Sequence, residues 1–332
     1  MTDGPKGGTK GGIVCAGNWI VDIVHVIDRW PGQSELVTIS HEAEGIGGGA
    51  ANVLLALDAF GVDVPLYAMG LVGSDQHGAT CRAALARSKA DLRWLGQTAR
   101  AMTAHTHVMT IRGQSRTFFY HPGCNDLLAG ADLPVEAAAG QGAGLFYLGY
   151  LNLLGALDAI TDGTTGAAKV LARAKAAGMV TCVDLVSKAG PEFAAVVAAA
   201  LPHIDYLFLN EVEVALATGL PVAGADDRMG IAAAAQVLLA GGVGKAVIIH
   251  TPALGLWTSH HGMVVRVPDP VRQMVNPLGA GDAFCAGVVW GIHQGWSPER
   301  SLALGHRAAA ECLKGETATG TIPPLTALMV GL

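Results

Sequence analysis

The sequence predicts an α/β fold in which a mostly parallel central sheet is flanked by helices and carries a small β-flap lid. Three observations support this prediction. Short apolar, β-branched runs recur along the chain, longer Ala-rich segments separate them, and two further segments alternate apolar and polar residues. The alternation of strands with helices is typical of a parallel sheet that helices cover. An apolar–polar alternation within one segment is typical of a half-exposed strand.

The buried strands are expected where the apolar runs show no polar alternation, because strands of a parallel sheet are buried on both faces. These runs span residues 13–24, 65–73, 144–150, 179–186, 206–210 and 245–251. The Ala-rich segments between them predict helices at 50–60, 76–89, 155–177, 190–201, 227–241 and 280–294.

The two alternating segments, residues 34–45 and 104–122, predict the lid. The second is expected to form a hairpin that turns at Gly113–Gln114. With their flanking residues the lid segments are 32–46 and 101–125, lying over one end of the main sheet. An isolated flap of this size is marginally stable. We therefore expect it to close over a ligand and to pair with a second subunit, giving a homodimer through the lid.

The remaining sequence shows no internal repeat, low-complexity linker or clear domain boundary. We expect a flexible N-terminal tail over residues 1–12 and a single domain over residues 13–332. The tail, MTDGPKGGTKGG, is polar and Gly-rich and lacks the apolar core of a signal peptide. No stretch of roughly 18 residues is continuously apolar, so the membrane is not an expected partner.

The composition narrows the function classes. Of the 332 residues, 51% are hydrophobic and 14% are charged, which provides for a large core and excludes a disordered chain. The 21 basic and 27 acidic residues give a net charge of −6. Nucleic acid is not an expected partner, because binding its phosphates needs a basic face. The six cysteines are scattered without a CxxC pair, so we expect reduced thiols in a cytoplasmic protein.

One stretch, VNPLGAGDAF (275–284), places small residues and a single acid at the start of an apolar helix. Gly279, Ala280 and Gly281 let another molecule approach the backbone closely. The free amides and the partial positive charge of a helix start favour a bound anion. Asp282 follows directly, where it could cap the helix or accept a proton from a ligand.

A second glycine-rich stretch, GIGGGAAN (45–52), matches the G-x-G-x-x-A pattern of NAD-dependent dehydrogenases. That fingerprint needs a buried strand directly before it. Here the polar stretch SHEAE precedes it, which disfavours a dehydrogenase. Two other interpretations stay open, namely close helix packing at a tight turn and the approach of the backbone and Asn52 to a small polar ligand.

LNEVEV (209–214) joins the end of a buried strand to the start of a helix. Asn210 and Glu213 then lie at the carboxyl end of the sheet, where open α/β sheets bind ligands. The same pair also fits a capping box with Asn210 as the N-cap. CVDLVSK (182–188) likewise ends a strand, with Asp184 inside and Lys188 at the mouth.

Two other kinds of site are disfavoured. The twelve histidines are dispersed, without a carboxylate or cysteine at ligand spacing, which argues against a zinc cage. The chain has no G-x-S-x-G motif to supply the nucleophile of a hydrolase.

Together these motifs resemble the ribokinase-like (PfkB-type) carbohydrate kinases, and the resemblance covers nearly the whole chain. The matching segments follow the family's order: GNWIVD (17–22), GIGGGAANVLLALDAFG (45–61), GLVGSDQHG (70–78), HPGCNDLL (121–128), NEVE (210–213) and NPLGAGDAF (276–284). Each motif is weak alone, but six in the right order argue against a chance match.

The resemblance implies a set of site residues. Asp282 is implied as the catalytic base, and the Gly279-Ala280-Gly281 turn as an anion hole for the phosphoryl group. The implied sugar-binding residues are Asp22, Gly47, Gly48, Asn52 and Asn125. The implied nucleotide-binding residues are Lys188, Asn210, Thr251, Gly255 and Gly281.

The resemblance also implies ATP and Mg²⁺ as the cofactors. Glu213 is implied to hold the magnesium ion through water, with Asn210 beside it. The family's signature begins with Asp-Thr, where the Asp helps to hold a potassium-type ion. Asn276 and Pro277 replace that pair here, which leaves a monovalent cation as an open question.

The implied function is the ATP-dependent phosphorylation of a hydroxyl on a small, ribose- or fructose-like sugar. The sugar and ATP are then the partners. A nucleoside kinase of the adenosine type and a sugar-phosphate kinase share the fold and stay open as alternatives. The lid aromatics Phe118, Phe119 and Tyr120 could stack on a base or pack the flap. A non-catalytic sugar-binding protein is disfavoured by the presence of Asp282.

Overall fold

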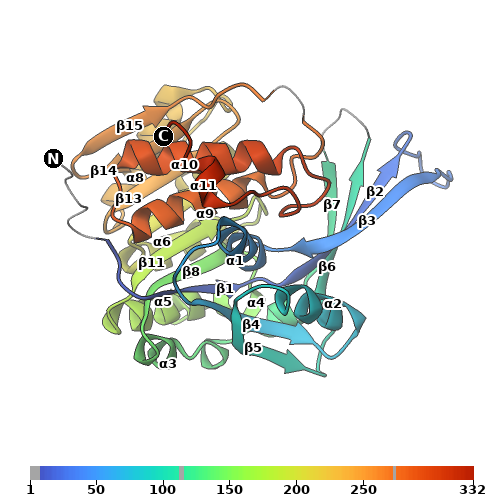
Figure 1. Cartoon of the computed structure of the whole chain (residues 1–332), viewed down its shortest axis with the longest axis horizontal. Helices are drawn as coiled ribbons and strands as arrows, with labels where there is room; N and C mark the ends of the chain where they lie inside the picture. Colours follow the sequence, from blue (N-terminus) through green and yellow to red (C-terminus); the bar gives the residue numbers. More distant parts are fainter. Residues whose placement is uncertain (1–7, 112–115, 272–273) are drawn as a thin grey trace.

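The computed structural model describes residues 8–111, 116–271 and 274–332. Figure 1 shows a large twisted sheet covered by helices, from which a smaller sheet projects at one end. The strand order of the large sheet is β15-β14-β13-β12-β11-β8-β1-β4-β5. Neighbouring strands from β13 to β5 run parallel, whereas β14 and β15 add an antiparallel edge. The predicted fold class is confirmed.

The strands of the large sheet are β1 (Gly12–Gly17), β4 (Leu66–Gly73), β5 (Asp91–Thr98), β8 (Ala143–Leu151), β11 (Val180–Leu185), β12 (Tyr206–Leu209), β13 (Ala246–His250), β14 (Gly255–Ser259) and β15 (Gly262–Arg266). The lid strands are β2 (Ile20–Ile27), β3 (Ile39–Gly47), β6 (Ala104–Thr110) and β7 (Arg116–His121). The helices are α1 (Gly49–Phe60), α2 (Gln76–Leu85), α3 (Val135–Gly140), α4 (Gly155–Asp158), α5 (Gly166–Ala176), α6 (Phe193–Ala200), α7 (Glu211–Thr218), α8 (Arg228–Ala240), α9 (Ala280–His293), α10 (Pro298–Cys312) and α11 (Leu325–Leu328).

Two hydrophobic cores lie on the two faces of the large sheet. On one face α1, α9 and α10 pack against the strands, and on the other α3, α5, α6 and α8 do so (Figure 1). Side chains of β1 alternate between them: Ile13 and Cys15 belong to the first core, and Val14 and Ala16 to the second. Burial on both faces explains why these strands read as continuous apolar runs.

The run 13–24, expected as one strand, forms two strands in different sheets, so this prediction is wrong. β1 ends at Gly17, whose φ of 118° is a conformation that favours glycine. Beyond it Trp19 is fully buried, and its Nε1 donates to the Met69 carbonyl at 3.1 Å. The chain thereby leaves the large sheet and continues into the lid as β2.

The lid sheet has the strand order β3-β2-β6-β7. Its strands β3, β6 and β7 fall in the predicted lid segments, whereas β2 is an addition to them and residues 32–38 form no strand. The turn expected at Gly113–Gln114 lies outside the described residues. Because β2 follows the carboxyl end of β1 directly, the lid lies at the carboxyl ends of the parallel strands (Figure 1).

The helix expected over 155–177 is wrong in its first half. After the short α4, the antiparallel strands β9 (Ile160–Thr161) and β10 (Thr164–Thr165) form a hairpin. Asp162 and Gly163 at its turn have φ of 53° and 75°, the positive values that an Asp-Gly hairpin turn requires. The Thr165 hydroxyl then accepts the Ala168 amide at 3.0 Å and caps α5.

The other predicted helices are present, with α2 and α6 shorter than expected. Strands β5, β14 and β15 and helices α3, α10 and α11 were not predicted, whereas α7 begins within LNEVEV (209–214), where a helix start was expected. Of the expected tail, Thr9 donates its amide to the His293 carbonyl at 2.8 Å, and Gly12 already belongs to β1. Within the described parts of the chain, no helix has both the length and the apolar character needed to cross a membrane.

Candidate active site

A cavity of about 660 Å³ lies between the lid and the carboxyl ends of the main strands. Three parts of the fold line it: lid strands β2, β6 and β7; the ends of β8, β11 and β13 with the segments that follow β11 and β12; and the starts of α1, α7 and α9. Open α/β sheets bind ligands at this edge. Of the predicted site residues, those lining the cavity are Asp22, Gly48, Asn52, Lys188, Asn210, Glu213, Gly279, Gly281 and Asp282.

Asp282 lies in the first turn of α9 and is 4% exposed. Its hydrogen bonds come from across the cavity. Asn52 Nδ2 donates to Oδ2 at 2.8 Å, and the Tyr150 hydroxyl lies 2.9 Å from both oxygens and donates its proton to one of them. These partners belong to α1 and β8, so the bonds hold the carboxylate toward the cavity and do not cap α9.

Four carboxyl groups share this cavity, and burial dominates their titration. Burial raises the pKa of Asp282 to about 6, although the hydrogen bonds from Asn52 and Tyr150 act to lower it. Burial likewise raises the pKa of Asp22 to about 7 and that of Glu213 to about 7. The pKa of Asp184 is raised well above its usual range by burial and then by the charges of Glu213 and Asp282. A cation bound here would relieve this repulsion.

The start of α9 offers free backbone amides to the cavity. Gly279 has a φ of 77°, and a Cβ on it would lie 2.4 Å from the Cβ of Ala318. The amides of a first helical turn have no partner within the helix and favour anions. Gly279 and Gly281 line the cavity, whereas Ala280 lies outside the lining and donates its amide to the Pro277 carbonyl at 3.4 Å.

Asn210 and Glu213 form the capping box that their spacing allows. The Asn210 amide donates to Glu213 Oε2 at 2.8 Å, and Asn210 Oδ1 accepts from the Glu213 amide at 2.9 Å. Glu213 Oε1 also accepts from the Ser187 hydroxyl at 2.8 Å, and all three residues line the cavity. The two interpretations of this motif are therefore compatible, because the box itself orients a buried carboxylate toward the cavity.

The lid supplies a second carboxylate. Asp22 of β2 pairs in register with Thr106 of β6, and both line the cavity. A Cβ on Gly47 would lie 1.9 Å from Asp22 Oδ2. Gly47 is outside the lining, but its missing side chain leaves the space that the Asp22 carboxylate occupies. Asn52 Oδ1 is buried and has no hydrogen-bond partner among the described residues, so it can accept a hydrogen bond from a ligand hydroxyl.

Three further predicted residues are not brought into the cavity lining. Asn125 is fully buried, and its Nδ2 donates to a lid tyrosine hydroxyl at 3.3 Å. The Thr251 hydroxyl donates to the Ala225 carbonyl at 2.7 Å and shapes the turn after β13. Gly255 begins β14, opposite His250 in the sheet register. From the end of β13, His250 is the residue that reaches the cavity.

The cavity contains residues that the motifs did not assign to the site: Arg116, Tyr150, Asp184, Ser187 and His250. Tyr150 has a φ of 57°, a sparsely populated conformation for a residue with a side chain and one found at functional sites. Tyr150 ends the predicted strand run 144–150, and His250 is the last residue of β13 within the predicted run 245–251. The position at a carboxyl strand end was the signal that could have found them.

The groups in the cavity fit a magnesium-bound polyphosphate. Magnesium prefers oxygen ligands and is usually held by one or two carboxylates together with substrate phosphates. Glu213 and Asp184 supply buried carboxylates, and burial raises the pKa of each, an effect that a bound cation would oppose. Lys188 and the amides of the α9 start supply positive charge for the phosphates.

Comparisons with known proteins agree with this geometry. The family model for pfkB family carbohydrate kinases matches residues 10–324. Among curated relatives, a 1-phosphofructokinase from Haemophilus influenzae is 32% identical over 80 residues, which cover 24% of this chain and 26% of that protein. The chain thus aligns with about a quarter of that relative's length.

Solved structures share the fold over nearly the whole chain. Arabidopsis thaliana ribokinase, complexed with ribose and ATP, superposes with a TM-score of 0.79 at 22% identity, covering 97% of this chain and 98% of the other. A Methanocaldococcus jannaschii nucleoside kinase gives 0.72 at 16% identity, with 98% of each chain covered. An E. coli protein assigned as a ribokinase II, solved with ATP and Mg²⁺, gives 0.74 at 18% identity, covering 96% and 98%. The chain belongs to the pfkB family of carbohydrate kinases, which are phosphotransferases.

Proposed function

We propose that this protein transfers the γ-phosphoryl group of ATP to a hydroxyl of a small, ribose- or fructose-like sugar. One observation carries the proposal. The buried Asp282 carboxylate is held by Asn52 and Tyr150 directly beside the free amides at the start of α9. A proton acceptor and an anion-binding helix start thereby face the same cavity, as phosphoryl transfer to a hydroxyl requires.

In this proposal Asp282 accepts the proton of the attacking hydroxyl. Its pKa of about 6 keeps most of it ionised at neutral pH while leaving it basic enough to act. The Tyr150 hydroxyl, whose own pKa burial raises well above its usual range, stays protonated and orients the carboxylate. Asp22 and Asn52 fix the sugar, and the Gly281 and Asp282 amides meet the charge on the moving phosphoryl group.

The nucleotide end of the cavity is proposed at Lys188, Asn210 and Glu213, with Thr251 and Gly255 shaping the turn behind it. Mg²⁺, when bound, would neutralise phosphate charge. Glu213 would hold the ion through water, with Asn210 beside it. The Arabidopsis ribokinase solved with ribose and ATP, and the E. coli structure with ATP and Mg²⁺, support this choice of ligands.

The test is ATP turnover measured with Mg²⁺ against a panel of pentoses, hexoses, sugar phosphates and nucleosides. We expect one free sugar to be phosphorylated with a kcat/KM well above all others. Product analysis by NMR then identifies the hydroxyl. The absence of ATP-dependent product with every member of the panel would contradict the proposal.

A sugar phosphate is the second candidate substrate, because Arg116 favours it. Arg116 reaches the cavity from lid strand β7, and its Nη1 is buried without a hydrogen-bond partner among the described residues. A guanidinium group binds phosphate well. The partial match to a 1-phosphofructokinase points in the same direction. A sugar phosphate outperforming its free sugar, with the preference lost in Arg116→Gln, would favour this candidate.

The nucleoside alternative remains an arm of the same panel. Phe118 and Tyr120 line the cavity from the lid, where an aromatic ring could stack on a base. The proposal also includes a cytoplasmic location, because all six cysteines are free, buried thiols.

A further inference from the structure

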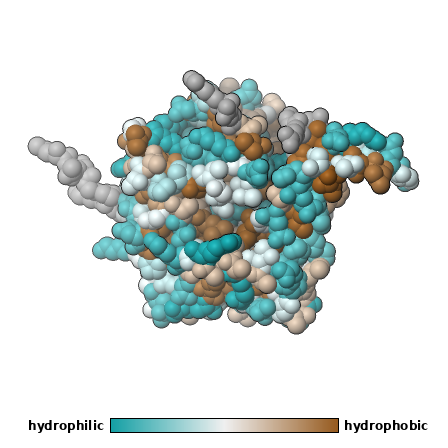
Figure 2. Space-filling model, turned by 45° about the vertical axis from the view of Figure 1, so that its right-hand side comes forward, coloured by the Kyte–Doolittle hydropathy of each residue, from teal (hydrophilic) through white to brown (hydrophobic). Residues whose placement is uncertain are grey.

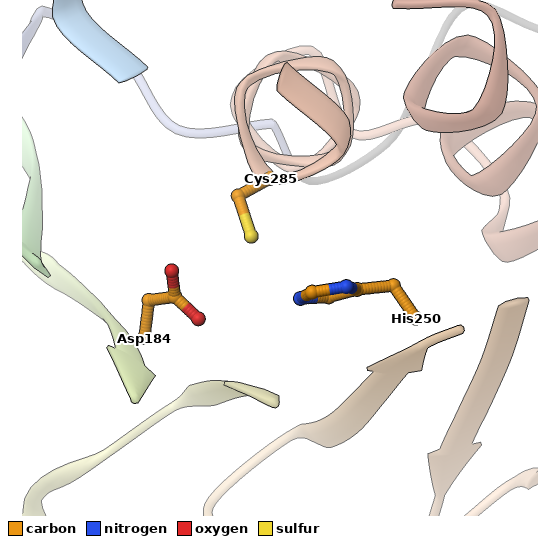
Figure 3. A group of neighbouring side chains, drawn as sticks. All are labelled: Asp184, His250 and Cys285. Atoms are coloured by element: carbon orange, nitrogen blue, oxygen red, sulfur yellow. The ribbon is translucent and has the colours of Figure 1, made fainter. Parts of the chain in front are cut away.

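Three side chains converge beneath α9. The proposed reaction assigns no common role to them. They are Asp184 at the end of β11, His250 at the end of β13 and Cys285 in the second turn of α9. One ligand atom from each lies within 4.8 Å of the other two. Figure 3 shows the far edge of the imidazole ring pointing toward the Asp184 carboxylate, with the Cys285 sulfur above the gap between them.

The donor atoms differ from those of a magnesium site. A thiol sulfur, an imidazole nitrogen and a carboxylate oxygen suit a borderline-soft ion such as Zn²⁺, whereas Mg²⁺ takes oxygen ligands. Asp184 and His250 also line the cavity, while Cys285 is fully buried behind them. A fourth coordination position would therefore face the cavity. Three protein ligands and one open position are the arrangement of an accessible zinc site.

Neighbouring groups already fix two of these ligands. The His250 ring packs beside Phe284 at a centroid distance of 5.2 Å, and a Cβ on Gly281 would lie 2.9 Å from its Cε1. Asp184 Oδ2 accepts from the buried Tyr147 hydroxyl at 3.2 Å. Such outer contacts orient the ligands of metal sites.

One buried atom of this set lacks a partner. His250 Nε2 has no hydrogen bond among the described residues and is shielded from solvent. Leaving a buried polar nitrogen unpaired costs free energy. Coordination of a metal ion would satisfy it.

We propose that Asp184, His250 and Cys285 form a binding site for a zinc-class divalent cation, which differs from the magnesium position at Glu213 in its imidazole and thiolate donors, and that its occupation inhibits turnover. The ion gains bonds to a carboxylate oxygen, an imidazole nitrogen and a thiolate sulfur. The Cys285 thiol loses its proton to solvent, and no electron is transferred. The inhibition rests on the proposed kinase function, whereas the binding does not. In that function the phosphates of ATP would lie against the cavity wall that the ion would occupy.

Binding is tested with the metal alone on the chelator-treated, full-length protein. Co²⁺ is titrated in and the thiolate-to-cobalt charge-transfer absorption is recorded, followed by displacement with Zn²⁺. We expect one ion per chain and a thiolate band in the wild type. Cys285→Ala should lose the band and bind Zn²⁺ at least roughly 100-fold more weakly, since changing even the outer partners of a metal site costs 10–100-fold.

Cys81→Ala is the matched control, because Cys81 is another fully buried cysteine, in α2. It should keep the band and the affinity. A wild-type titration without a thiolate band overturns the site, and this result does not depend on whether any variant folds. A band that persists in Cys285→Ala overturns it equally.

Inhibition is tested by adding Zn²⁺ to turnover at fixed Mg²⁺ and ATP. We expect the wild type and Cys81→Ala to be inhibited, and Cys285→Ala to retain its basal rate and lose at least tenfold in zinc sensitivity. Equal inhibition of wild type and Cys285→Ala overturns the inhibitory role. If the kinase proposal is wrong, no substrate gives turnover, but the cobalt band is still observed. Failure of the kinase proposal can therefore be distinguished from failure of the metal site.

Discussion

Asp22, Asp184, Glu213 and Asp282 face one cavity and are each under 10% exposed. At the residue scale this costs stability, because burial raises the pKa of each carboxyl group. A carboxyl group with a raised pKa in the folded state binds protons more tightly there than in the unfolded chain. These groups therefore favour folding most when the pH is below their pKa in the unfolded chain. This contribution to stability is lost as the pH rises through their pKa in the folded protein. Such strain is a usual feature of functional sites.

Asp22→Asn should therefore stabilise the protein at alkaline pH. The pKa of Asp22 is about 7 in the folded state, against an ordinary value near 3.8. The free energy of unfolding of the variant should exceed that of the wild type at pH 8, and the difference should shrink as pH falls toward 4. Chemical denaturation across this pH range is the measurement. A variant less stable than the wild type at pH 8 would show that the carboxylate is compensated in the folded protein.

Glu213→Gln should lower turnover and raise the Mg²⁺ concentration needed for half-maximal rate. The amide keeps the shape of the capping box but removes the charge that faces the cavity, so the stability change should stay within about 1 kcal/mol. Glu211→Gln, which changes an acid in the same first turn outside the cavity lining, is the control. If Glu213 served only as a cap, both variants would show the same magnesium dependence.

At the element scale, strand runs and helices were predictable where periodicity or continuous apolarity was strong. The helix from Ala280 to His293 agrees with the prediction within one residue at its end, because its small residues and apolar run both mark it. The run 13–24 failed because composition does not reveal that the buried Trp19 redirects the chain. The segment 155–177 failed because its Asp162-Gly163 turn signal was outweighed by the surrounding helix formers.

The lid should form the contact of a homodimer. Trp30, Leu36 and Ile39 are 43%, 84% and 45% exposed, and apolar side chains appear along the projecting arm in Figure 2. Light scattering with size exclusion should give twice the chain mass, and Ile39→Lys should shift it toward the monomer. Ile160→Lys, a change at an equally apolar position exposed by 39% on the β9–β10 hairpin, should leave the mass unchanged. A strictly monomeric wild type at high concentration would refute the dimer and leave the lid's closing role unaffected.

The loop before α9 should make the enzyme insensitive to potassium. Asn276 stands where the family's signature has an Asp, and its side chain is engaged within the protein: Nδ2 donates to the Glu316 carbonyl at 2.8 Å, and Oδ1 accepts from the Leu278 amide at 3.0 Å. The Asn276 side-chain amide is neutral and already hydrogen-bonded, so it brings no charge to a cation site. Turnover should therefore differ little between potassium and sodium salts at equal ionic strength. Strong, saturable activation by potassium alone would show that backbone carbonyls suffice.

At the scale of the whole molecule, the site is assembled from segments that are distant in sequence. Asp282, Asn52 and Glu213 could be predicted because each belongs to a local motif. Tyr150 and His250 belong to no local motif, and the only sequence signal for them was their position near the carboxyl ends of predicted strands, which converge at the cavity. The same holds for the Asp184–His250–Cys285 cluster, whose members fit no metal-ligand spacing along the chain. Spacing rules detect local constellations, whereas this one exists only in the folded sheet.

The most direct test of phosphoryl transfer at this cavity is the turnover of Asp282→Asn with the best substrate, measured beside its binding of ATP and sugar. The amide preserves size and can still hydrogen-bond Tyr150, but it cannot accept the proton of the attacking hydroxyl. We expect a folded variant that binds both ligands and turns over roughly 10²–10⁴-fold more slowly, the usual cost of losing a general base. A variant with wild-type turnover, even one destabilised by about 1 kcal/mol as for a lost helix cap, would contradict the account and remove Asp282 from the mechanism.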